Sequence, residues 1–191
     1  MKKTVLTFGL ISGVIASVLM IATIQFVERI GFDRGMIVGY TAIVLSFLLV
    51  FFGIRSYREN VGGGYISFGR AFSVGILITL ISCAFYVVTW EIAYFNFLPD
   101  FFEKYSNYIL ESARASGASA EEIAAQREQM QRMAVLYQNP FFNALFTFME
   151  PFPVGLLVTL ISAAVLRKRR PQVPDGEAEL VNPQPSHVQT R

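Results

Sequence analysis

The 191-residue chain is poor in the side chains that carry most enzyme chemistry. It has one histidine, one cysteine and 16% charged residues, whereas soluble domains carry about 25%. His187 lies in a proline-rich tail, and Cys83 lies within a long apolar run. A single cysteine excludes an intrachain disulfide. The three aspartates (Asp33, Asp100 and Asp175) are too widely scattered to hold a metal ion together. We therefore expect no enzyme activity, no metal ion and no cofactor.

Long uncharged apolar runs dominate the chain instead. The run over residues 71–90 contains 20 residues, about the length that a helix needs to cross a hydrocarbon core of roughly 30 Å. Similar runs predict an all-α integral membrane protein with four transmembrane helices, at residues 5–27, 35–54, 71–90 and 151–166. The first run is too long for the apolar part of a signal peptide, so we interpret it as a retained span. The net charge of +2 is too small to indicate nucleic acid binding.

The segment between the third and fourth spans is polar and helix-forming. Ser119 followed by Glu122 forms a capping box that starts a new helix. Its apolar residues recur at helical spacing, at Ile123, Met130, Met133, Ala134 and Tyr137. These features predict an extracytoplasmic helical hairpin over residues 99–139, with one apolar face turned toward the bundle or the bilayer surface.

The hairpin is followed by a helix, a break and the fourth span. We expect a short interfacial helix over residues 141–149 and a break at Glu150-Pro151, because proline fits the first turn of a helix but not its interior. Residues 171–191 contain four prolines and predict a disordered cytoplasmic tail.

Lysine and arginine are distributed unevenly between the two predicted sides of the membrane. The N-terminus, the loop between the second and third spans, and the end of the fourth span carry nine of them, at residues 2, 3, 55, 58, 70 and 167–170. Short basic loops remain in the cytoplasm. We therefore expect both termini in the cytoplasm and the hairpin outside it.

Small residues mark faces where helices can approach closely. Residues 74–82 and 154–162 are identical at seven of nine positions, and we expect the face of Gly75, Thr79 and Cys83 to pack against that of Gly155, Thr159 and Ala163. Gly9, Gly13 and Ser17 form a similar face in the first span. This face predicts either packing within the bundle or a dimer contact.

Four separated motifs together resemble a known family. They are Gly-Gly-Gly-Tyr-Ile-Ser-Phe-Gly-Arg-Ala-Phe at 62–72, Phe-Leu-Pro-Asp-Phe at 97–101, Arg-Ala-Ser-Gly-Ala-Ser at 114–119, and Asn-Pro-Phe-Phe-Asn with Glu-Pro-Phe-Pro-Val-Gly within 139–155. In this order they resemble the bacterial membrane family of domain of unknown function 4199, found mainly in Bacteroidetes-type bacteria. The resemblance covers about residues 1–168. It implies a multi-pass protein of the bacterial cytoplasmic (inner) membrane, and it implies no activity.

Glu150, Glu91, Arg29 and Arg34 are candidates for a polar site under the hairpin, because all four lie near the outer ends of the spans. Charged groups at membrane depth are costly and usually functional, and a polar group at a broken helix is typical of transporter sites. The alternative is that the four residues are structural caps and ion pairs at the interface.

The loop between the second and third spans is a candidate site for a lipid phosphate or another anion. It combines arginines with glycines that allow close backbone approach, at Arg55, Arg58, Gly62, Gly63, Gly64 and Arg70. The alternative is a turn whose arginines only fix the topology.

Two classes of function are consistent with these features. The first is an accessory or interaction protein of the bacterial envelope, whose hairpin forms a homo-oligomer or binds a membrane protein partner. The second is a small transporter or a ligand- or lipid-binding membrane protein that uses the broken fourth helix at Glu150-Pro151. Membrane lipids are expected partners in both cases.

Overall fold

A computed structural model describes residues 1–169 of the chain, except for the side chain of Glu28. The described part is 87% helical and contains no strand, only one isolated bridge pair. Its helices are α1 (Lys2–Ile30), α2 (Phe32–Asn60), α3 (Phe68–Phe97), α4 (Phe101–Ala115), α5 (Ala120–Tyr137), α6 (Pro140–Met149) and α7 (Pro151–Leu166). The tail predicted over residues 171–191 lies outside the described residues.

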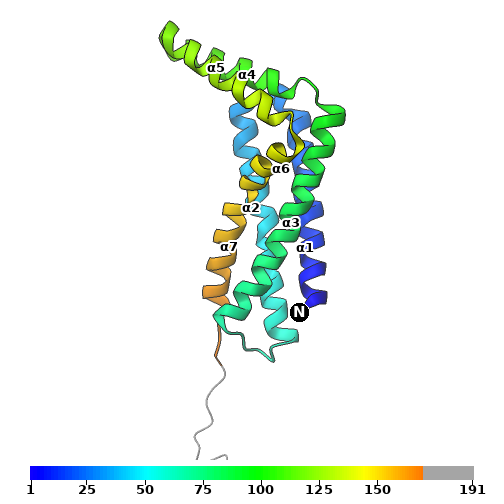
Figure 1. The fold of residues 1–191 in the computed structure, drawn as a ribbon. Helices are drawn as coiled ribbons and strands as arrows, with labels where there is room; N and C mark the ends of the chain where they lie inside the picture. The colour runs from blue at the N-terminus through cyan, green and yellow to red at the C-terminus, as the bar shows by residue number, and fades with distance from the viewer. Residues whose placement is uncertain (170–191) are drawn as a thin grey trace, which may run out of the picture.

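Four segments are long and apolar enough to cross a membrane, namely Lys2–Val27, Phe32–Asn60, Phe68–Phe97 and Pro140–Leu166. The predicted fold class, an all-α integral membrane protein with four transmembrane helices, is confirmed by this length and composition. The first three segments are single long helices, whereas the fourth consists of α6 and α7 in series (Figure 1). Glu150 separates these two helices, because it is the C-cap residue of α6 and the N-cap residue of α7.

α3 and α7 meet through the two similar small-residue faces. The hydroxyls of Thr79 and Thr159 hydrogen-bond at 3.0 Å, and both side chains are fully buried. A Cβ atom built on Gly75 would lie 2.8 Å from Thr159 Cγ2, and one built on Gly155 would lie 2.5 Å from Thr79 Cγ2. The predicted contact is therefore confirmed as a reciprocal one, in which each glycine receives the threonine of the other helix.

α1 packs against α3 through its own small residues. A Cβ atom on Gly9 would lie 2.9 Å from Ile81, and one on Gly13 would lie 2.8 Å from Phe85. Ser17 accepts a hydrogen bond from Thr89 at 2.8 Å. Of the two expectations for this face, packing within the bundle is the one that the structure shows.

α4 and α5 lie across one end of the bundle and extend past it (Figure 1). Ser119 caps α5, and both hydrogen bonds of the predicted capping box with Glu122 are present. Phe32, at the start of α2, holds α4 in place, because its ring lies 5.0 to 6.2 Å from three aromatic rings of α4. The Tyr108 hydroxyl also donates a hydrogen bond to Asp33. This bond raises the pKa of Tyr108.

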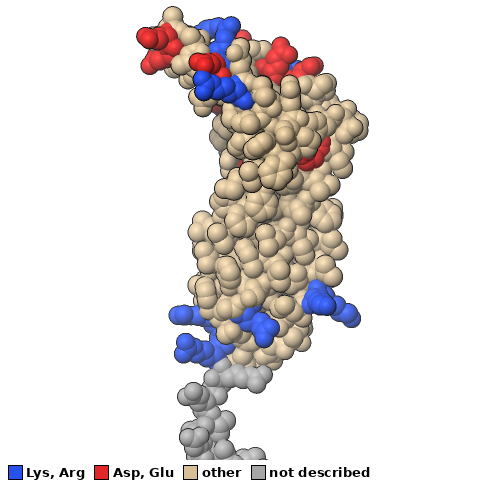
Figure 2. All heavy atoms as spheres, in the orientation of Figure 1, with Lys and Arg blue, Asp and Glu red and all other residues tan. Residues whose placement is uncertain are grey.

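The charges gather at the two ends of the molecule. On the face that Figure 2 draws, the charged side chains at the end that holds the N-terminus are lysine and arginine, and the hairpin at the other end carries charges of both signs. Between the two ends the visible surface is almost free of charge (Figure 2). This pattern suits a bundle whose middle is surrounded by lipid.

Candidate functional site

A cavity of about 480 Å³ lies between the bundle and the hairpin. α1, α2 and α3 contribute one part of its lining, α4 and α5 another, and α6 contributes its last turns. Most of the lining side chains are apolar or aromatic, among them Met20, Ile43, Phe101, Met130 and Phe146. Ligand pockets typically have volumes of about 300–1,000 Å³. The cavity is therefore large enough for a small molecule or for part of a lipid.

Glu150 lines this cavity at the break between α6 and α7. Its Oε2 atom accepts a hydrogen bond of 3.1 Å from the Tyr86 hydroxyl on α3. The carboxylate also lies at the N-terminus of α7, where the helix dipole favours negative charge. A capping side chain accepts a hydrogen bond from the N–H group of the second or third residue of the helix, and the third residue of α7, Pro153, has no N–H group. The Glu150 side chain makes no cap hydrogen bond, and it is available to the cavity.

Asn143 fixes α6 to its neighbours. This side chain is fully buried, and its Oδ1 atom accepts hydrogen bonds from Trp90 Nε1 at 2.8 Å and from Thr147 at 3.3 Å. Its Nδ2 atom donates to the carbonyl of Tyr137, the last residue of α5, at 3.0 Å. Asn143 thus joins α3, α5 and α6 at one point. Because Trp90 and Thr147 both line the cavity, this network also fixes one of its walls.

An aromatic cluster centred on Tyr137 closes the space beside Asn143. The Tyr137 ring stacks on Phe146 with centroids 5.7 Å apart, and it lies 5.1 Å from Phe102 and 5.9 Å from Tyr94. Burial raises the pKa of the Tyr137 hydroxyl, and the nearby charge of Glu150 adds to this effect. These contacts connect the hairpin to α6 through stacked ring faces and to α3 through an edge-to-face contact.

The apolar stripe of α5 faces inward. Met130, Met133 and Tyr137 line the cavity, and Ile123 and Ala134 are half-buried outside it. The stripe therefore helps to cover the cavity. It does not form a free apolar surface on the outside of the hairpin.

The structure does not join the four residues of the predicted polar cluster. Glu150 lines the cavity, whereas Glu91, Arg29 and Arg34 do not. Both arginines are exposed, at the end of α1 and the start of α2. Glu91 has a buried Oε1 atom that finds no hydrogen-bond partner among the described residues. Since no hydrogen bond or ion pair connects any two of the four, the candidate site contains Glu150 alone of this set.

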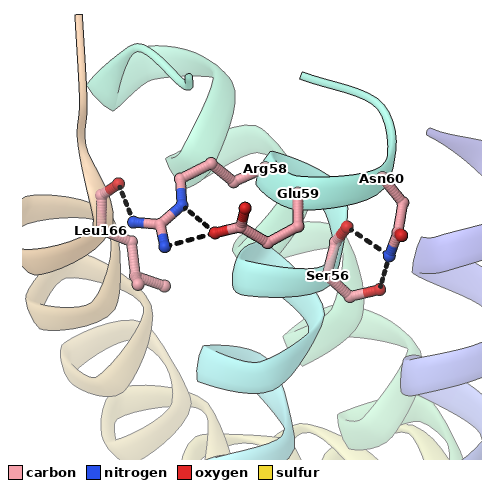
Figure 3. A network of polar contacts seen from close by, with 5 residues as sticks. All are labelled: Ser56, Arg58, Glu59, Asn60 and Leu166. Atoms are coloured by element: carbon pink, nitrogen blue, oxygen red, sulfur yellow. Dashed lines mark hydrogen bonds and ion pairs between the residues drawn. The ribbon is translucent and has the colours of Figure 1, made fainter. Parts of the chain in front are cut away.

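At the opposite end of the molecule, Arg58 is occupied by structural contacts. Its Nε and Nη2 atoms donate to Glu59 Oε1 at 2.9 and 2.6 Å, and its Nη1 atom donates to the carbonyl of Leu166 at 3.3 Å (Figure 3). Leu166 ends α7, and the last carbonyls of a helix have no partner within it. Arg58 therefore joins the end of α2 to the end of α7. Arg55 is exposed and lines no part of the cavity described below.

The three glycines form an ordered turn. Gly63 and Gly64 have positive φ angles of 60° and 85°, a region that side chains with a Cβ atom rarely adopt. A Cβ atom on Gly62 would lie 2.2 Å from the carbonyl oxygen of Tyr65. The backbone N–H groups of Gly62 and Gly64 donate to the carbonyls of Tyr57 and Arg58 at 3.0 Å. The glycines are thus required by the chain reversal after α2.

Arg70 shares a cavity with Lys168 and Arg169, whereas the sequence predicted that it would lie with Arg55 and Arg58. Ile66 and Lys168 form two backbone hydrogen bonds of 2.9 Å, which bring the chain after α7 beside the chain before α3. A second cavity of about 370 Å³ results, lined by Arg70, Lys168 and Arg169 together with the Gly62–Tyr65 turn. Of the predicted anion site, Arg70 and Gly62 line this cavity, and Arg55, Arg58, Gly63 and Gly64 do not.

A comparison with known families is decisive for classification. The family described as protein of unknown function (DUF4199) matches residues 7–168. The chain belongs to this family. No curated protein and no solved structure matches it. The family description assigns no activity to the DUF4199 domain.

Three residues at or beside the cavity of this DUF4199 protein were not predicted as site residues from the sequence. Tyr86 and Trp90 line the cavity and Asn143 lies beside it. All three stand in apolar or aromatic surroundings, and each hydrogen-bonds a residue on another element. Trp90 is the only tryptophan, which is a hint of an anchor. Among the described residues, no group of three or more His, Cys, Asp or Glu side chains is placed to hold a metal ion.

Proposed function

We propose that this DUF4199 protein is a ligand-binding membrane protein, not an enzyme, and that its ligand is a membrane-soluble molecule held in the 480 Å³ cavity. The observation that supports this proposal is the cavity itself, with its mostly apolar lining and the carboxylate of Glu150. Ligand sites are typically apolar pockets with a few placed polar groups. The inward-facing methionines of α5 support it further, because unbranched methionine side chains adapt to ligands of varied shape.

We further propose that the protein lies in the bacterial cytoplasmic membrane with both termini in the cytoplasm. The basic end of the molecule supports this orientation, because it carries lysine and arginine alone on the visible face (Figure 2). The cavity then lies in the outer half of the bundle, and the hairpin covers it from outside. A ligand can enter from the outer leaflet in this arrangement.

The test uses two glycines that differ only in their position. Gly39 lines the cavity, and a Cβ atom there would meet nothing within 4 Å. Gly69 also has nothing within 4 Å, but it lies in the first turn of α3, away from the cavity. We expect Gly39→Leu to fill the cavity and Gly69→Leu to leave it open.

The measurement is native mass spectrometry of the protein released from lipid nanodiscs. The proposal expects the wild-type protein and the Gly69→Leu variant to retain the same small molecule or lipid, and the Gly39→Leu variant to lose it. Equal retention by all three proteins would place the bound molecule on the outer surface and refute the proposal.

A second candidate function is the accessory or interaction role. α5 contains no fully buried residue, and the hairpin extends past the bundle (Figure 1). Its outer surface carries exposed charges that include Arg127 and Arg132. If this surface forms a homo-oligomer or binds a membrane protein partner, charge reversal at both arginines should dissociate the oligomer or release the partner. The Gly39→Leu variant should keep such a partner, so the two functions separate experimentally.

A further inference from the structure

The cavity under the hairpin is electrostatically one-sided. Among the described residues, Glu150 is the only Asp or Glu that lines it, and no described lysine, arginine or histidine does. The other polar groups of the lining are hydroxyls, one glutamine amide and the Trp90 indole. A carboxylate that is withdrawn from water requires a hydrogen-bonded or charged partner to offset its desolvation.

Only one of the two carboxylate oxygens of Glu150 has a hydrogen-bond partner among the described residues. Its Oε2 atom accepts the Tyr86 hydroxyl, and no described group donates to its Oε1 atom. The two cations of the predicted cluster, Arg29 and Arg34, are exposed and line no part of the cavity. One carboxylate oxygen in the cavity is therefore free to accept a hydrogen bond from a ligand.

We infer that the ligand is a lipophilic amine, whose ammonium group binds Glu150 and whose apolar chain fills the rest of the cavity. This inference rests on the proposed function and names the substrate class of the same site. An ammonium group supplies both the positive charge and the N–H donors that Glu150 lacks. The aromatic rings of Tyr86, Trp90 and Phe146 also line the cavity, and aromatic faces attract cations.

The lining also distinguishes between two kinds of amine. An amine-bearing phospholipid carries a phosphate next to its ammonium group. Because no basic side chain of the described residues lines the cavity, that phosphate would be left without a counter-charge. A free amine with an alkyl chain has no such group. Met20, Ile24, Met130 and Met133 offer it an apolar surface of matching character.

The test exploits the single tryptophan. Trp90 lines the cavity, so a brominated ligand bound there quenches the only tryptophan emission of the protein. The probes are 12-bromododecylamine and 12-bromododecanol, which differ at the head group alone. Both are titrated into nanodisc-embedded protein, and their concentrations are compared as mole fractions in the bilayer.

Two variants provide the matched pair. Glu150→Gln removes the charge and retains an oxygen that can accept the Tyr86 hydrogen bond. Glu91→Gln removes the other carboxylate of this region, which lies one residue after Trp90 but outside the cavity. We expect the amine to quench wild-type protein at a concentration about tenfold or more below that of the alcohol, as charged hydrogen bonds allow. Glu91→Gln should preserve this ratio, and Glu150→Gln should abolish it.

Each contrary result has a distinct meaning. Equal quenching by both probes in wild-type protein overturns the amine inference and leaves the ligand-binding proposal intact. Loss of the ratio in Glu91→Gln, or its persistence in Glu150→Gln, also overturns the inference, because the cation would bind elsewhere. Competition by phosphatidylethanolamine in the nanodisc overturns the exclusion of phosphate-bearing amines. Quenching that is the same in wild-type protein and in Gly39→Leu refutes the proposed function itself.

Discussion

Replacing Gly155 by alanine tests how closely α3 and α7 are packed. The added Cβ atom would lie 2.5 Å from Thr79 Cγ2 and 2.8 Å from Phe47 Cζ. Overpacking of this kind costs about 1–3 kcal/mol, and two blocked directions place Gly155 near the upper end. Alanine has a higher helix propensity than glycine by about 1 kcal/mol. The net expectation is a loss of about 2 kcal/mol in the free energy of unfolding.

The assay is unfolding in mild detergent followed by circular dichroism. For a chain of this size the expected loss corresponds to a Tm lower by about 4–8 °C. Gly39→Ala is the control, because a Cβ atom there meets nothing within 4 Å. Only the helix propensity changes at that position, so its Tm should stay the same or rise.

A double variant identifies the cause of the loss. Thr79→Ser removes the methyl group that Gly155→Ala would strike, and it keeps the hydroxyl that bonds Thr159. The two changes together should be less destabilising than their sum, by about 1 kcal/mol or more. Strict additivity, or a Gly155→Ala variant as stable as Gly39→Ala, would refute the close packing of these helices.

Three further predictions concern other parts of the molecule. Asn143→Leu leaves the Trp90 indole N–H without its acceptor, so we expect a loss of about 1–3 kcal/mol in unfolding free energy and a shifted Trp90 emission maximum. Hydrogen bonds from Ser119 lower the pKa of Glu122. The ionised Glu122 therefore stabilises the hairpin helix fully above the ordinary glutamate pKa, and this stabilisation should be lost as the pH falls through the lowered pKa. Circular dichroism should show that the helicity of Glu122→Gln depends less on acid pH than that of the wild-type protein. Arg70→Gln removes a cation from the basic cavity, so the amount of anionic phospholipid that copurifies should fall about fivefold in lipid mass spectrometry, since about 1 kcal/mol is typical for one such contact.

The sequence was most informative where one residue type alone determines the structure. The near copies around Thr79 and Thr159 predicted a contact because small residues at a spacing of four share one helix face. The capping box at Ser119 predicted the start of α5 because both of its bonds are local. Glu150 stood out since a carboxylate beside a proline is unusual in an apolar segment.

The remainder of the candidate site depends on distances that no local pattern encodes. Asn143 and Trp90 are 53 positions apart in the chain, and only the docking of α6 on α3 brings them together. Tyr86 meets Glu150 for the same reason. Arg70 and Lys168 share a cavity because a bridge joins two loop segments. The expected grouping of Glu91 with Glu150 required knowledge of helix rotation, which the hydrophobic pattern of a span with few polar residues leaves undetermined.

The most direct test of the ligand-binding proposal is an X-ray structure of the protein crystallised from lipid with 12-bromododecylamine, using the anomalous signal of bromine. The proposal expects a bromine peak inside the cavity, close to Trp90, Phe146 or another lining side chain, with the amine end of the probe at Glu150. Bromine peaks confined to the lipid-facing surface of the helices, with Glu150 contacted only by Tyr86, would contradict it.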